Sequence, residues 1–131
     1  MTAELMNKAN KALASARLLL NADDSDGATN RAYYAMFDAA IAALLWIDTA
    51  ATRTIPKSHA GLIASFGISL IQTGHLPAGL GRSLNRVQEL RLTADYLAEP
   101  VPWDKAAAAV REAEAFVEAV GHLLLTKPSA V

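Results

Sequence analysis

Hydrophobic residues recur at helical spacing along almost the whole chain, and no stretch alternates between apolar and polar positions as a strand does. The first apolar stripe predicts a helix that Thr2 caps and that runs to about Ala22. Turn-forming residues fill positions 23–27, and a second helix is expected from there to about Ala50. The hydrophobic pattern thus begins with two long helices joined by a short turn.

Caps, glycines and prolines divide the rest of the chain into three more helices. The expected boundaries are, in order, a loop at 51–57 fixed by Pro56, Ser58 as the cap of a third helix that ends near Gly74, Pro77 at the start of a fourth, Pro100 and Pro102 between helices, and Asp104 as the cap of the last. Four long helices and one shorter helix with short connections predict an all-α, antiparallel up-and-down bundle. We expect a single domain over residues 1–131, with its core at about 5–125, that forms a homodimer.

The second helix carries the least ordinary pattern. Asp38 is the only charged residue between Ala32 and Ile47, so almost every face of this helix is apolar and it belongs at the centre of the bundle. Arg31, Tyr34 and Asp38 lie at i, i+3 and i+7, which places them on one side as a polar stripe that needs partners. The acidic residue near the middle also argues against a membrane span.

Composition removes several functional classes. A hydrophobic fraction of 53% excludes a disordered chain, and a net charge of −1 without a long basic run argues against binding nucleic acid by bulk charge. The absence of cysteine excludes disulfides and thiolate chemistry. His59, His75 and His122 are scattered, so we expect surface or capping roles for them and no metal or other cofactor. The N-terminus lacks signal-peptide features, which favours a cytoplasmic protein without a membrane association.

An arginine interrupts the apolar face of the fourth helix. Leu84 and Val87 lie on that face, and the next position on it is Arg91, with Asp95 at ion-pair spacing. An arginine on an apolar stripe must extend to water, form a pair or serve an interface. Tyr96 follows, and its simplest interpretation is a half-buried aromatic residue.

Two interpretations of this arginine remain open. In the first, Arg91 and Asp95 pair with Asp38 and Arg31 in a buried polar layer between helices. In the second, Arg91 lines a polar cleft where it holds a phosphate. In both, we expect the Arg91 guanidinium to meet the Asp38 carboxylate in a pocket shaped by two copies of the chain.

Several segments together resemble the HEPN domain family, specifically its small stand-alone prokaryotic members. They are R-A-Y-Y-A-M-F at 31–37, K-S-H-A-G at 57–61, F-G at 66–67, T-G-H-L-P at 73–77 and R-L-T-A-D-Y at 91–96. The resemblance implies a helical bundle that dimerises. It also implies a minimal nucleotidyltransferase as partner, with the two proteins acting as toxin and antitoxin.

Many HEPN proteins are metal-independent RNases, whose signature is an arginine followed four to six residues later by a histidine on one helix. Carried over by position, the arginine is Arg91, but Tyr96 stands five residues on and no histidine lies nearby. Tyrosine, with an ordinary pKa near 10, is a poor base at neutral pH. Some HEPN toxins are silenced when the partner transfers nucleotides onto a tyrosine near the signature, and Tyr96 lies in the corresponding region.

Three functions therefore remain open. The first is a toxin-type RNase with Arg91 and Tyr96 as catalytic candidates and Arg31, Tyr34, Asp38 and Asp95 around them. The second is an inactive dimeric module that binds a nucleotidyltransferase or a nucleotide, and the missing histidine favours it. The third is a structural adaptor in which the polar stripe only holds helices together.

Overall fold

The computed structural model describes residues 1–47, 55–56 and 58–127, and the described residues contain helices but no strands. The helices are α1 (Thr2–Asn21), α2 (Ser25–Ile47), α3 (His59–Phe66), α4 (Ala78–Leu97) and α5 (Trp103–Leu124), with a π-helical segment η1 (Gly67–Ile71) after α3. The prediction of an all-α fold with four long helices and one short helix is confirmed.

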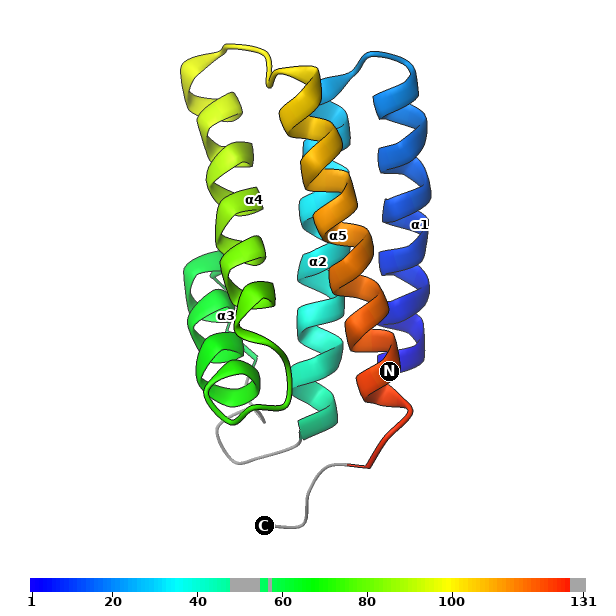
Figure 1. The fold of residues 1–131 in the computed structure, drawn as a ribbon, viewed down its shortest axis with the longest axis vertical. Coiled ribbons are helices and arrows are strands. Elements are labelled where there is room, and N and C mark those ends of the chain that lie inside the picture. Colours follow the sequence, from blue (N-terminus) through cyan, green and yellow to red (C-terminus); the bar gives the residue numbers. More distant parts are fainter. Residues whose placement is uncertain (48–54, 57, 128–131) are drawn as a thin grey trace.

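The four long helices alternate in direction along the bundle (Figure 1). In the view of Figure 1, α2 lies behind α5, between α1 on one side and α4 on the other. The short α3 lies beside the N-terminal half of α4, and the connection from α4 to α5 crosses the opposite end of the bundle. The site described below lies where α2, α3 and α4 meet.

The cap of α3 agrees with the prediction. The Ser58 Oγ accepts a hydrogen bond from the Gly61 backbone N–H at 3.0 Å. Glycine is required at position 61, because a Cβ there would lie 2.8 Å from the Ser58 Oγ and 2.9 Å from the Pro56 Cβ. This tight turn fixes the first residue of α3, His59, against the rest of the bundle.

Two predicted caps are wrong. Thr2 is the first helical residue of α1, and Met1 occupies the N-cap position without a side-chain hydrogen bond. Likewise, α5 begins at Trp103 after Pro102, so Asp104 lies in the first turn. There its carboxylate still suits the positive end of the helix dipole.

The third helix changes form before its predicted end. After Phe66 the backbone continues as a π-helix, in which the Gln72 N–H bonds to the Gly67 oxygen at 2.9 Å. Gly74 then adopts a φ of +78°, a conformation that favours glycine, and ends the segment. The predicted end of the second helix near Ala50 and most of the predicted loop at 51–57 lie outside the described residues.

The core is built around α2, as its all-round apolar pattern predicted. Eleven of its residues are buried, and most of them are alanines. Alanines on α5 face them, and small side chains let two helix backbones approach closely. Phe66 packs on Phe116 with ring centres 5.2 Å apart, which joins α3 to α5 across the core. Among the described helices, none is long and apolar enough to span a bilayer.

Candidate functional site

Arg91 lies on aromatic rings rather than in water. Its guanidinium carbon is 4.9 Å from the ring centre of Tyr33 and 5.8 Å from that of Tyr34, and only 12% of its side chain is exposed. The Arg91 Nε donates to Gln88 at 3.1 Å, and Nη1 donates to Asp95 at 3.4 Å. The predicted pair with Asp95 is therefore confirmed. These contacts hold the Arg91 guanidinium close to both rings, within the range of cation–π attraction.

A histidine from α3 completes the aromatic cluster, by which we mean Tyr33, Tyr34, Phe37 and His59. The Tyr33 hydroxyl and the His59 Nδ1 form a hydrogen bond of 2.7 Å. The His59 ring lies 4.9 Å from that of Phe37 and 5.9 Å from that of Tyr34, centre to centre. Because Tyr33 is fully buried, the cluster is anchored in the core.

Burial sets the protonation of this cluster. It raises the pKa of Tyr33 to about 12, although the nearby Arg91 charge opposes the rise. Burial also lowers the pKa of His59, and the Arg91 charge lowers it further. At neutral pH, Tyr33 is therefore a neutral phenol and His59 a neutral imidazole, while Arg91 provides the positive charge.

A second arginine, Arg31, lies close to Tyr34. The guanidinium carbon of Arg31 lies 5.3 Å from the ring centre of Tyr34. Arg31 also lines a pocket of about 220 Å³ between α1 and α2, together with Lys8, Lys11 and Asp38. Burial raises the pKa of Asp38, and the charges of Lys8 and Arg31 oppose this rise. Arg31 thus lies near both the α1 lysines and the aromatic cluster.

The predicted contact between Arg91 and Asp38 does not form within one chain, and a contact across two copies stays a prediction. The charged neighbours of Asp38 are Lys8 and Arg31 on the α1 side, and no ion pair joins it to Arg91 within the part of the chain that the structure describes. Asp38 lies one turn, about 6 Å, along α2 from Tyr34 and is rotated by about 40°. The stripe is therefore split, with Tyr34 facing Arg91 and Asp38 facing α1. Within one chain, the buried polar layer expected between Arg91 and Asp38 does not form.

Tyr96 lies apart from this cluster. It stands five residues after Arg91, which places it about 140° around α4. Its side chain is 82% exposed, so the expectation of a half-buried aromatic residue is wrong. Within one chain, Arg91 and Tyr96 do not form a common site.

Tyr33, Phe37 and His59 were not among the site residues that the sequence singled out. The surface or capping role expected for His59 is wrong, because its ring packs into the cluster and bonds to Tyr33. Sequence signals existed for each: the histidine follows the cap serine, and the two aromatic residues are four apart on one helix face. Their meeting with Arg91 depends on packing between segments that are far apart in sequence.

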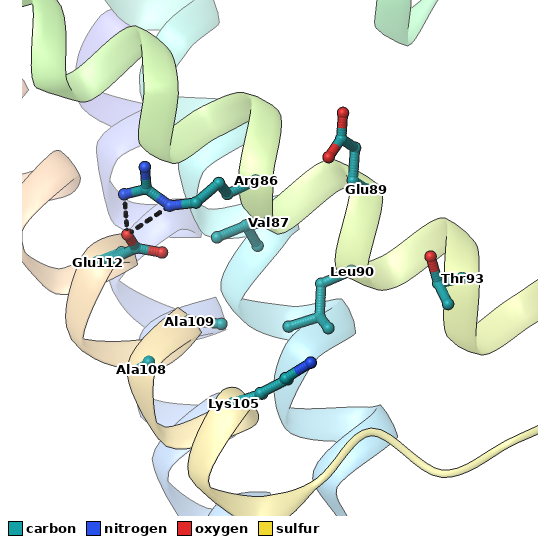
Figure 2. A pocket seen from close by; sticks show the side chains of 9 residues that line it. All are labelled: Arg86, Val87, Glu89, Leu90, Thr93, Lys105, Ala108, Ala109 and Glu112. Atoms are coloured by element: carbon teal, nitrogen blue, oxygen red, sulfur yellow. Dashed lines mark hydrogen bonds and ion pairs between the residues drawn. The ribbon is translucent and has the colours of Figure 1, made fainter.

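The opposite side of α4 carries a different kind of surface. A groove of about 400 Å³ lies between α4 and α5, with Leu90 and Lys105 among its lining residues. Figure 2 shows Arg86 reaching across this groove to Glu112, to which its Nε donates at 3.1 Å. This is an ordinary ion pair near solvent, and it serves below as the matched control for Arg91.

Comparisons with known proteins agree with this fold. The model of the HEPN domain matches residues 2–123. A protein of Methanocaldococcus jannaschii named "Putative toxin" is 33% identical over 121 residues, which cover 92% of this chain and 86% of the relative. A UPF0332 protein of Gloeobacter violaceus is 38% identical over 93 residues, covering 71% of this chain and 70% of the relative. A UPF0332 protein of Thermotoga maritima is 34% identical over 119 residues, or 89% of this chain and 86% of the relative. Because the family model covers nearly the whole sequence, this chain belongs to the HEPN domain family.

Proposed function

We propose that this HEPN protein is the toxin-side component of a pair with a minimal nucleotidyltransferase, and that its ligand is RNA bound at the cluster around Arg91. Two jannaschii relatives that carry the name "Putative toxin" support a toxin-like role. The geometry of the site supports RNA as the ligand, as follows.

The observation that carries the proposal is the convergence of two guanidinium groups on one tyrosine. Arg31 and Arg91 both lie within 6 Å of the Tyr34 ring centre. Two positive charges near the same ring favour the binding of an anion at this cluster. A phosphate accepts paired hydrogen bonds from arginine, which makes it a suitable anion for this place.

Further cations lie near Arg31. Lys8 and Lys11 on α1 lie next to Arg31, and Arg31 shares Tyr34 with Arg91. A line of cations suits a chain of phosphates better than a single anion. The half-buried Tyr34 adds an aromatic ring to these cations, a combination that sites for single-stranded RNA use.

A binding measurement tests the proposal. Fluorescence anisotropy with a labelled single-stranded RNA should show at least about tenfold weaker binding for Arg91→Ala and for Arg31→Ala. Each loss should also reduce the slope of log affinity against log salt by about one. Arg86→Ala is the control, because it removes the same charge from the same helix on the groove side, and it should bind within about twofold of wild type. Equal affinities for all three variants would overturn the proposal.

The homodimer and the nucleotidyltransferase belong to the same proposal. Tyr96 and Leu97 are 82% and 62% exposed, which gives a partner an apolar surface at the end of α4. A nucleotidyltransferase reading frame beside this gene would support the pairing. Mixing the two purified proteins and measuring the mass of the complex by light scattering would test it directly, with Tyr96→Ser expected to weaken the complex.

The second candidate, a dimeric module that binds but cleaves nothing, rests on the absence of a histidine after Arg91 on α4. Retained RNA binding without any cleavage product would favour it.

A further inference from the structure

We propose that the pocket between α1 and α2 binds a phosphomonoester, the doubly charged phosphate group that ends an RNA chain or a mononucleotide. Where that phosphate belongs to RNA, the inference rests on the proposed function, because it assigns the end of the same RNA to a pocket of its own. It goes further by naming the kind of phosphate that the protein recognises. The pocket shares Arg31 with the RNA site proposed above.

One face of each helix lines this pocket. The lining residues of α1 lie at i, i+3, i+4 and i+7, from Lys8 to Ser15, and those of α2 lie at i and i+7, at Arg31 and Asp38. The two helices run in opposite directions (Figure 1). Lys8 therefore lies level with Asp38, on whose carboxyl its charge acts, and Ser15 lies level with Arg31. The pocket follows the contact line of the two helices over two turns, or about 10 Å.

Three cations and one carboxylate face the pocket. Lys8 and Lys11 are exposed, while Arg31 and Asp38 are half-buried. None of the three cations forms an ion pair within the part of the chain that the structure describes, although Asp38 lines the same pocket. The formal charges of the four side chains therefore leave two positive charges uncompensated.

This excess charge matches a phosphomonoester better than a phosphodiester within an RNA chain. A phosphomonoester carries a charge of about −1.5 to −2 at neutral pH, whereas each phosphodiester carries one negative charge. Ammonium and guanidinium groups donate charge-assisted hydrogen bonds to phosphate oxygens. The hydroxyl of Ser15 in the pocket lining is a further possible donor. A bound phosphomonoester thus balances the charge of the pocket.

The volume of the pocket suits a phosphate group and not a whole nucleotide. It is about 220 Å³, less than the roughly 300 Å³ at which pockets for complete small molecules begin. The rest of the ligand must then lie outside the pocket. Arg31 lines the pocket, and its guanidinium carbon lies 5.3 Å from the ring centre of Tyr34. An RNA whose terminal phosphate occupies the pocket can therefore continue toward Tyr34 and Arg91.

The first test uses three labelled RNAs of one sequence, with a 5′-phosphate, with a 3′-phosphate, or with hydroxyl groups at both ends. In fluorescence anisotropy, wild type should bind one of the phosphorylated RNAs at least about tenfold more tightly than the unphosphorylated RNA, as charge-assisted hydrogen bonds allow. A variant that carries both Lys8→Ala and Lys11→Ala should lose this preference. Lys105→Ala removes an exposed lysine from the groove between α4 and α5, and this matched control should keep the preference.

A substitution of Asp38 separates the charge of the pocket from its shape. Asp38→Asn keeps the size of the side chain and removes the negative charge that repels the ligand. The variant should therefore bind the preferred phosphorylated RNA at least about twofold more tightly than wild type does. Weaker binding by this variant would contradict the charge balance and overturn the proposal. Circular dichroism melting curves check that each variant keeps its fold.

Free phosphate compounds distinguish an RNA end from a mononucleotide as the source of the phosphate. In NMR titrations, inorganic phosphate and a nucleoside 5′-monophosphate should each shift the backbone amide signals of residues 8–15 in wild type. The same signals should stay unchanged in the double lysine variant. Such shifts without any preference among the three RNAs assign the pocket to a free phosphomonoester.

Failure of this inference can be told from failure of the proposed function. Suppose that RNA binds through Arg91, that a terminal phosphate does not change its affinity, and that free phosphate shifts no signal. The phosphomonoester site is then overturned, and the proposed function stands. Shifts from free phosphate in a protein that binds no RNA have the opposite meaning, because they overturn the proposed function and leave the pocket as a site for a free phosphomonoester.

Discussion

Two arginines on α4, five residues apart, lie in different environments, one exposed to solvent and one nearly buried. Arg86 points into the groove beside α5, where 57% of its side chain is exposed and it pairs with Glu112. Arg91 lies on the rings of Tyr33 and Tyr34 with 12% exposed, and Asp95, its carboxylate partner, is itself 60% exposed. The helix thus presents one arginine to solvent and sets the other on the aromatic cluster.

The difference shows that the protein removes one of these two arginines from water, at a cost in hydration energy. A solvated ion pair such as Arg86–Glu112 contributes between zero and about 1 kcal/mol, and it can be lost without consequence. Arg91 gives up most of its hydration for ring faces and partial hydrogen bonds, an arrangement that packing alone does not demand. A leucine there would pack against the same rings. Under the proposed function, this charge serves to bind the ligand.

The largest expected effect is a loss of stability when Tyr33, the residue that supports Arg91, is truncated. Tyr33→Ala deletes a fully buried ring and should lower the free energy of unfolding by about 3–5 kcal/mol. Leu90→Ala on the groove side removes a partly buried residue and should cost less than about 2 kcal/mol. Urea denaturation of both variants measures the difference. Equal losses would mean that the two sides of α4 are equally well packed.

A smaller effect separates the arginines themselves. Arg91→Ala should cost about 1–2 kcal/mol, because it removes a desolvated cation–π contact, while Arg86→Ala should cost about 0.2–1 kcal/mol. A buried pair between Arg91 and Asp38 would have made the first loss about 3–5 kcal/mol. Chemical denaturation in low and high salt checks both values, since salt should weaken the ion pairs but not the cation–π contacts of Arg91. A loss above 3 kcal/mol for Arg91→Ala would restore the interpretation of a structural pair.

The smallest effect is a pH dependence confined to the Arg91 side. Because the His59 pKa is lower in the folded protein, the unfolded chain binds more protons between the two values. The contribution of His59 is therefore complete above about pH 6.5 and is lost as the pH falls toward the folded value. Unfolding free energies at about pH 7.5 and about pH 5 should differ more for wild type than for His59→Asn. His122→Asn should keep the wild-type difference, and a loss of it there would contradict the assignment.

Much of the fold follows from local patterns. The helical spacing of apolar residues predicted the number and order of the helices, and the all-round apolar stretch from Ala32 to Ile47 predicted the central one. Ser58 and Pro77 marked helix starts correctly, since caps act within a few residues. The caps at Thr2 and Asp104 were misplaced because several nearby residues suit a helix start. The π-helical segment after Phe66 had no signal in the apolar spacing.

The features of the site also divide into those that the sequence predicts and those that only the fold decides. The sequence by itself determined that Arg91 stands on an apolar face with Asp95 in reach. It also determined that Arg31, Tyr34 and Asp38 share a side of the central helix. Both follow because the spacing of residues along one helix fixes their relative directions. Only the tertiary structure decided which helix each of them faces. It turned Asp38 toward the α1 lysines, set Arg91 on Tyr33, and brought His59 from α3 to the same ring. Those choices depend on how neighbouring helices rotate and slide as they pack, which no spacing within a single segment records.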